Sequence, residues 1–248
     1  MTNRMVVFLV CALAGSCGGS PPQSAPSPSP PAAPEATRAP VEVAPDHPVP
    51  RNAIALADAV DQRLIAIRPR GAGVQRISLE LVAHADVAVA IPAGTYFRGV
   101  PDKDFQNMVV TKSVGAQLAA GTSIVIAVPA ACTNFHRRMP GVNDRFELAS
   151  AEPALHHLVT CLEHRDVDNA LRQIIVWTLT DAIDRESLTR RKGMLAPYLV
   201  EKCTRRLRQP AARCTALVDA AYDAAVDELL ERRDAFPECS SPADLAQS

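Results

Sequence analysis

Hydrophobic and polar residues alternate with a period of two along residues 54–134. The clearest runs are 76–81, 87–91 and 123–128, where every second residue is aliphatic. This alternation is typical of strands with one buried face. Glycine-containing turns at 71–73, 92–94 and 120–122 separate the runs, at spacings typical of an antiparallel sandwich or barrel. We predict an antiparallel β-sandwich over residues 51–148.

The hydrophobic period changes to 3.6 after Pro140-Gly141. Three apolar stripes follow at helical spacing, over 155–162, 171–179 and 218–229. They predict an α-helical subdomain over residues 149–236 and leave residues 237–248 as a flexible tail. The predicted fold class is therefore α+β, a β-sandwich followed by a helical subdomain. The phrases IPAGTYF, QNMVVT and VPAACTN are similar to those of uncharacterised secreted bacterial β-sandwich domains, a resemblance that implies a fold and no activity.

The chain begins with Arg4, an apolar run over residues 5–14 and then small residues, which is the layout of a signal peptide over residues 1–16. The run is too short to cross a bilayer, because a spanning helix needs about 20 residues. Leu13-Ala14-Gly15-Ser16-Cys17 resembles the lipobox of bacterial lipoproteins. The resemblance implies that Cys17 is diacylated and becomes the mature N-terminus. The alternative is an ordinary signal peptide cleaved near Ser16 or Ser20, which would leave a soluble secreted protein.

The lipobox resemblance also predicts where the protein is held. No acidic residue follows Cys17, since Gly18 and Gly19 come next, so by the resemblance nothing retains the protein at an inner membrane. We expect a protein of the cell envelope, anchored through Cys17 in the outer membrane.

Residues 17–50 predict a disordered linker. Eleven of the chain's 21 prolines lie between Pro21 and Pro50, interleaved with serine and alanine. Such a segment cannot bury enough apolar surface to fold. As a semi-extended spacer it could reach roughly 100 Å and hold the folded part away from the bilayer.

Composition excludes one class of partner. The formal net charge is −1, and the basic runs 190–192 and 205–208 are set among acidic residues. Nucleic-acid binding needs a clustered basic face, so we interpret these runs as solvated helix faces. The expected partners are the membrane, through Cys17, and an envelope protein.

Five cysteines besides Cys17 lie beyond the signal region, and export allows disulfides. Cys203 and Cys214 flank Gln209-Pro210 at similar distances, so a helical hairpin that turns there would bring them together. We predict a disulfide between Cys203 and Cys214. A second disulfide, between Cys132 and Cys161, would join the sheet to the helices and leave Cys239 unpaired.

Two patterns suggest chemistry without completing it. His157, Cys161 and His164 have the spacing of zinc ligands on one helix face, but the sequence supplies no fourth ligand, so we predict no metal or other cofactor. Cys132 and His136 suggest a secreted thiol hydrolase, which needs a thiolate beside a base. No third group or recognisable motif supports such an enzyme, so we assign no catalytic residue.

Residues 172–177, RQIIVW, are similar to the glutamine-containing helix of bacterial surface thioester domains. The resemblance implies a bond between the Gln173 side chain and a cysteine, here Cys132, that captures amines. The alternative is that Gln173 is a polar residue of an amphipathic helix and Trp177 belongs to the core. The sequence predicts a lipid-anchored, non-enzymatic binding or structural protein, with a thioester adhesin and a thiol hydrolase as the alternatives.

The lipid anchor is tested by the substitution Cys17→Ala. We expect the variant to leave the membrane fraction without unfolding, because the linker separates the anchor from the folded residues. Detergent phase partitioning of the variant and the wild-type chain measures this. Retention of Cys17→Ala in the detergent phase would contradict the lipobox interpretation.

Overall fold

The computed structural model describes residues 41–43, 48–73, 75–101, 104–233 and 236–240. Its strands are β1 (Val41–Val43), β2 (Ile54–Ala55), β3 (Ile65–Gly71), β4 (Arg76–Ala83), β5 (Val87–Ile91), β6 (Tyr96–Val100), β7 (Met108–Val110), β8 (Val114–Leu118), β9 (Ser123–Cys132) and β10 (Arg145–Ala149). Its helices are α2 (Leu56–Asp61), α3 (Pro153–Glu163), α4 (Asn169–Asp181), α5 (Arg185–Leu207), α6 (Ala211–Arg233) and α7 (Pro237–Ser240). The predicted signal peptide, Cys17 and most of the predicted linker lie outside the described residues.

The strands form a closed barrel, so the prediction of a sandwich is wrong. Six antiparallel strands follow one another in the order β9-β4-β3-β10-β6-β7, and β7 pairs again with β9. The ten residues of β9 make closure possible, because β4 pairs along most of its length and β7 pairs with its last three residues. Alternation predicts one buried face per strand, and a sandwich and a small barrel both satisfy that pattern.

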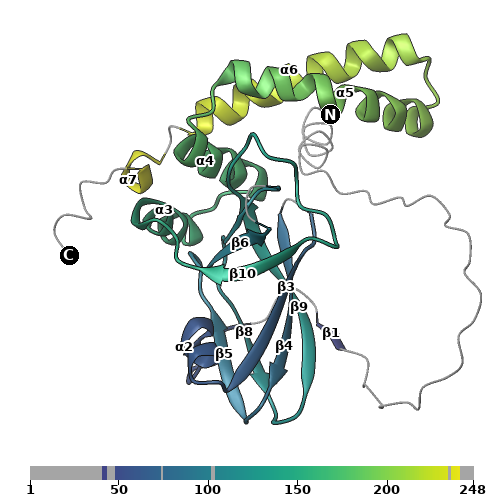
Figure 1. Cartoon of the computed structure of the whole chain (residues 1–248). Coiled ribbons are helices and arrows are strands. Elements are labelled where there is room, and N and C mark those ends of the chain that lie inside the picture. Colours follow the sequence, from purple (N-terminus) through teal and green to yellow (C-terminus); the bar gives the residue numbers. More distant parts are fainter. Residues whose placement is uncertain (1–40, 44–47, 74, 102–103, 234–235, 241–248) are drawn as a thin grey trace, which may run out of the picture.

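A separate three-stranded sheet, β2-β5-β8, lies beside the barrel together with α2 (Figure 1). β1 adds to the edge of β9 in parallel, ahead of the β7 pairing. These two additions show that the strands do not divide into the two facing sheets of a sandwich.

The prediction of a helical subdomain is also wrong, because the helices share one core with the strands. A single cluster of buried residues runs from the strands, with Phe97 and Met108, into the helices, with Leu158, Trp177 and Leu188. α3 and α4 lie against one end of the barrel, and α5 and α6 form an antiparallel pair that extends beyond it (Figure 1). The three apolar stripes do lie on helices, α3, α4 and α6. The helical period alone does not indicate which other elements such a stripe packs against.

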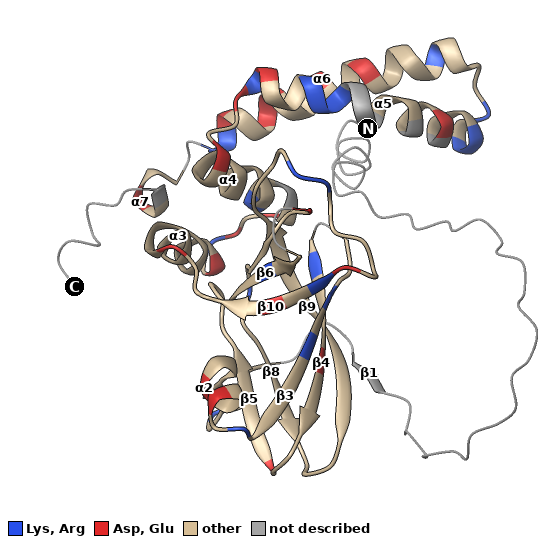
Figure 2. Cartoon of the chain, viewed as in Figure 1, with Lys and Arg blue, Asp and Glu red and all other residues tan. Residues whose placement is uncertain are grey.

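Acidic and basic residues are spread along α5 and α6 (Figure 2). Several form ion pairs, including Lys192 with Asp219 at 3.1 Å and Arg205 with Glu201 at 2.9 Å. The interpretation of the basic runs as solvated helix faces holds for the exposed residues Arg190, Arg205, Arg206 and Arg208. It does not hold for Arg191, which is buried, or for Lys192, whose side chain is 17 % exposed. Within the described part of the chain, no helix has the length and apolarity needed to cross a membrane.

One disulfide prediction is confirmed and the other is wrong. Cys203 and Cys214 are bonded across the α5–α6 turn, with Cα atoms 5.8 Å apart. Cys161, however, is bonded to Cys239, with Cα atoms 5.5 Å apart, and Cys132 is a buried thiol.

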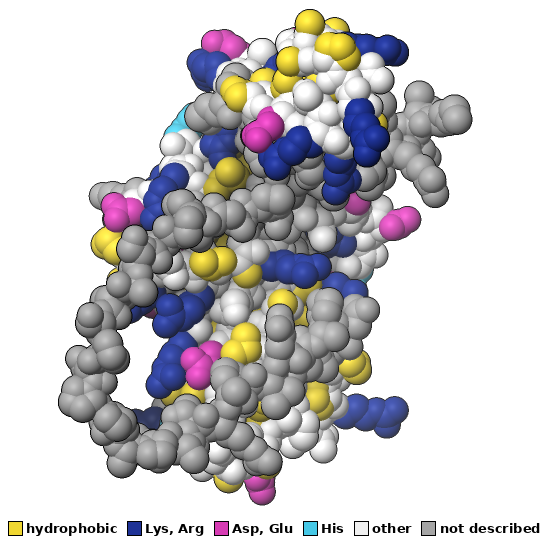
Figure 3. Space-filling view, turned by 90° about the vertical axis from the view of Figure 1, so that its right-hand side faces the viewer, with side chains coloured by type: hydrophobic (Ala, Val, Ile, Leu, Met, Phe, Trp, Pro, Cys, Tyr) yellow, Lys and Arg dark blue, Asp and Glu magenta, His cyan; other side chains and the backbone are white. Residues whose placement is uncertain are grey.

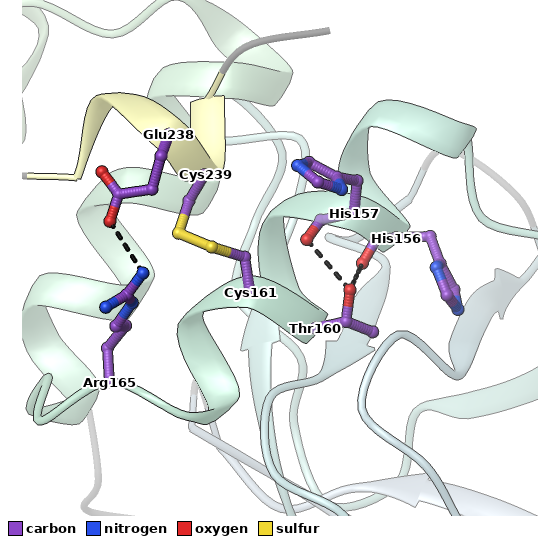
Figure 4. Close-up of a disulfide and its surroundings, with 7 residues drawn as sticks. All are labelled: His156, His157, Thr160, Cys161, Arg165, Glu238 and Cys239. Atoms are coloured by element: carbon purple, nitrogen blue, oxygen red, sulfur yellow. Dashed lines mark hydrogen bonds and ion pairs between the residues drawn. A yellow bond between two sulfur atoms is a disulfide. The ribbon is translucent and has the colours of Figure 1, made fainter. Parts of the chain in front are cut away.

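The Cys161–Cys239 bond fastens the end of the described chain to α3. α7 brings Cys239 back to α3, where an ion pair of 3.1 Å between Arg165 and Glu238 lies beside the disulfide (Figure 4). The sequence carries no strong signal for this return, because the helix is four residues long. Residues 237–240 are therefore not part of a flexible tail.

The Cys203–Cys214 disulfide closes a short loop, and its removal should lower the melting temperature. A separation of 11 residues corresponds to about 3 kcal/mol of chain entropy. For a chain of this size that is a decrease of about 6–12 °C. Calorimetry on a variant with both cysteines replaced by alanine measures the decrease.

The matched comparison is replacement of both Cys161 and Cys239 by alanine. That bond spans 78 residues, for which the same argument gives about 4.5 kcal/mol and a larger decrease. An unchanged melting temperature for the Cys203/Cys214 variant would exclude a stabilising role for its disulfide.

Candidate functional site

The candidate site lies where the end of β9 meets α4. Cys132 is the last residue of β9 and pairs with Met108 of β7 on one side. On the other side the ladder with β4 ends at Pro129, so the edge of β9 has no strand partner at Cys132. A buried edge of this kind must find hydrogen bonds elsewhere, because unpaired backbone groups are costly.

The side chain of Gln173 fills this missing position. Its Nε2 donates to the carbonyl oxygen of Cys132 at 2.7 Å, and its Oε1 accepts from the backbone N–H of Cys132 at 2.8 Å. Both residues are buried, Cys132 completely and Gln173 with 5 % exposure. The amide of one side chain therefore replaces a strand's peptide group and joins the barrel to α4.

α4 is held in position by its own first turns. Asp168 accepts from the N–H of Leu171 at 2.9 Å and caps the helix. The guanidinium of Arg172 is buried and donates to the backbone carbonyls of Thr111, Arg165 and Val167 at 2.9–3.2 Å. These bonds orient α4 so that the next residue, Gln173, faces β9.

A cation and two aromatic rings lie beside the site. Phe135 and Trp177 meet edge to face with ring centroids 4.9 Å apart, and the guanidinium carbon of Arg191 lies 4.9 Å from the Phe135 centroid. Arg191 also donates to the carbonyl oxygen of Phe135 at 3.0 Å. Trp177 is a core residue, as the alternative interpretation held, and its indole N–H is buried without a hydrogen-bond partner among the described residues.

Electrostatics at the site act on the thiol in opposite directions. Burial raises the pKa of Cys132 well above its usual value, and the positive charge of Arg191 offsets part of that increase. Burial likewise lowers the pKa of Arg191 and raises the pKa of Tyr222 to about 12. At neutral pH Cys132 is a protonated thiol, a weak nucleophile towards anything that diffuses in from solution.

The structure does not bring the predicted hydrolase pair together. His136 is exposed and contacts Phe135 edge to face, with ring centroids 5.4 Å apart, whereas Cys132 is buried in the core. The residues with zinc-like spacing also do not come together as ligands. Cys161 is bonded to Cys239, and the imidazole of His157 lies apart from the disulfide (Figure 4). The described residues contain no cluster of three or more potential metal ligands.

Sequence reasoning named Cys132 and Gln173 but missed Arg191. The run Arg190-Arg191-Lys192 was assigned as a whole to a solvated face, yet Arg191 is only 9 % exposed. Its position three residues after Leu188 places it on the apolar stripe of α5, a signal that could have singled it out.

Comparison of the chain with protein-family models, with curated proteins and with solved structures found no significant match.

The Gln173–Cys132 contact predicts a large effect of Gln173→Leu on stability. Leucine would leave the N–H and the carbonyl of Cys132 buried and unpaired, at about 1–3 kcal/mol for each group. We expect the free energy of unfolding to fall by at least 2 kcal/mol, as measured by denaturant titration.

Gln117→Leu is the matched control, because Gln117 is the exposed residue of β8. It should change the free energy of unfolding by less than about 0.5 kcal/mol. Equal effects of the two substitutions would show that the contact contributes nothing particular to the fold.

Proposed function

We propose that this chain is a non-enzymatic binding protein of the cell envelope that attaches to an amine of its partner through a thioester between Cys132 and Gln173. The observation that carries the proposal is the pair of hydrogen bonds between the Gln173 amide and the backbone of Cys132. They hold the amide against the residue whose thiol would attack it, although 41 residues separate the two in sequence.

Formation of the thioester needs no external reagent. The sulfur of Cys132 attacks the side-chain carbonyl carbon of Gln173, the new carbon–sulfur bond replaces the carbon–nitrogen bond, and ammonia leaves with the thiol proton. One hydrogen bond to Cys132 is then lost with the nitrogen, while the carbonyl oxygen of Gln173 keeps its acceptor role. In the second step a partner amine attacks the same carbon, an amide forms and the thiol of Cys132 is released.

The surroundings favour an internal reaction over attack on a molecule from solution. The two hydrogen bonds hold the Gln173 amide beside the backbone of Cys132. An intramolecular reaction of groups brought together in this way gains an effective concentration of up to about 10⁵–10⁸ M, which would offset the weak nucleophilicity of a buried thiol. The positive charge of Arg191 supports development of thiolate character at Cys132. Burial excludes water from the thioester and protects it from hydrolysis. An amine would reach the carbon when the contact between α4 and β9 opens.

The anchor and linker fit the same role. A diacylated Cys17 would hold the chain on the outer membrane, and the proline-rich segment would let the barrel reach a partner away from the bilayer. Permanent attachment at both ends is useful to a protein that links the envelope to another surface, and it requires no turnover.

Intact-mass measurement of the purified chain tests the proposal. We expect the wild-type chain to be lighter by one ammonia than its sequence and modifications require, and to gain one methylamine on incubation with that amine. Cys132→Ala and Gln173→Ala should each lose the deficit and the gain, whereas Gln117→Ala should keep both.

The thioester would be contradicted if the wild-type chain had its full mass and did not react with methylamine. In that case the Cys132 thiol would also be alkylated in every denatured molecule. Gln173 would then be a structural residue that completes the edge of β9.

A further inference from the structure

The strand pairing with the fewest paired residues in the barrel is that between β3 and β10. β3 pairs with β4 over seven positions, but it pairs with β10 only through Arg70 and Arg145. One further backbone hydrogen bond, from Gly71 to Asp144 at 3.0 Å, lies at the same end. The strands therefore diverge from this corner and leave a gap in the barrel wall.

Two arginines face each other at that corner. Like charges directly opposite one another on paired strands are destabilising. The acidic residues nearby are bonded to other arginines, since Glu80 pairs with Arg68 at 3.3 Å and Asp144 pairs with Arg138 at 2.6 Å. Within the described part of the chain, neither Arg70 nor Arg145 has an acidic partner.

The gap between the strands is a cleft of about 400 Å³. Its lining combines three arginines with three apolar residues: Arg68, Arg70, Arg145, Ile67, Pro69 and Phe146. The arginines are exposed, whereas Pro69 and Phe146 are buried. Basic residues of β3 and β10 are coloured on the ribbon in Figure 2. Figure 3 shows basic side chains, with some acidic ones, on the face turned towards the viewer.

We propose that this cleft binds a phosphate monoester, with the phosphate between Arg70 and Arg145 and the organic part against Phe146 and Pro69. A phosphate dianion matches the two guanidinium groups of Arg70 and Arg145 better than a carboxylate does, and arginine binds phosphate in a bidentate manner. The ligand would neutralise the repulsion that the unliganded corner retains. A cleft of this size is in the range of small-molecule sites.

Titration calorimetry of the full chain in detergent, with phenyl phosphate as the probe, tests the proposal. We expect saturable binding that raises the melting temperature, because a ligand that binds only the folded state stabilises it. The double variant Arg70→Gln/Arg145→Gln should bind at least tenfold more weakly. Without ligand it should melt no lower than the wild-type chain, because a like-charge pair has been removed.

Arg51→Gln is the matched control, since it removes one exposed charge from a turn outside the cleft and should bind as wild type does. Potassium chloride at equal ionic strength should not reproduce the effect of phenyl phosphate on the melting temperature. Equal affinity in the wild-type chain and the double variant, or no binding to the wild-type chain, would overturn the proposal.

A second arm distinguishes the source of the phosphate. The Cys17→Ala chain is sedimented with phosphatidylcholine vesicles that contain or lack phosphatidic acid. Sedimentation that requires both phosphatidic acid and the two arginines would assign the cleft to a lipid headgroup. Calorimetric binding of phenyl phosphate without such sedimentation would assign it to a soluble monoester.

Discussion

The hydrogen bonds between the Gln173 amide and the backbone of Cys132 are the interaction on which the rest of the structure depends. The six-stranded barrel closes because β9 pairs with β4 along its first part and with β7 at its last three residues. At those last residues the edge of β9 that faced β4 has no strand partner. An open edge in the core is costly. The side chain of a helix fills it, and for that reason the helices belong to the same folding unit as the barrel.

The same arrangement gives the site its chemistry. Pairing of a side-chain amide with a backbone edge is a structural solution, but here the residue that supplies the edge is a cysteine. The thiol is buried beside a buried cation, Arg191, and His136, the nearest base in sequence, faces solvent. This environment is poor for repeated catalysis on a diffusing substrate and suited to a single internal reaction. The proposed covalent role follows from that difference.

The sequence predicted local features well and spatial relations unevenly. Alternation located β4, β5 and β9, and helical stripes located α3, α4 and α6. The position of Pro210 between two cysteines predicted the Cys203–Cys214 bond. Closure of the barrel escaped prediction because a strand's period is the same in a sandwich and in a barrel. The partner of Cys161 escaped because Cys239 lies 78 residues away, on a short helix whose docking depends on the folded surface. Gln173 and Cys132 were associated through a resemblance of one helix, whereas Arg191 was lost within a run of basic residues.

Nuclear magnetic resonance of the Gln173 side chain tests the central claim most directly. In a chain labelled with ¹³C and ¹⁵N at glutamine, the signals of Gln173 are identified by their absence from Gln173→Ala. The account predicts that the Gln173 side-chain carbon resonates as a thioester without an attached NH₂ group, and that methylamine converts it to a secondary amide. An intact NH₂ pair on Gln173 in every molecule, unchanged by methylamine, would contradict it.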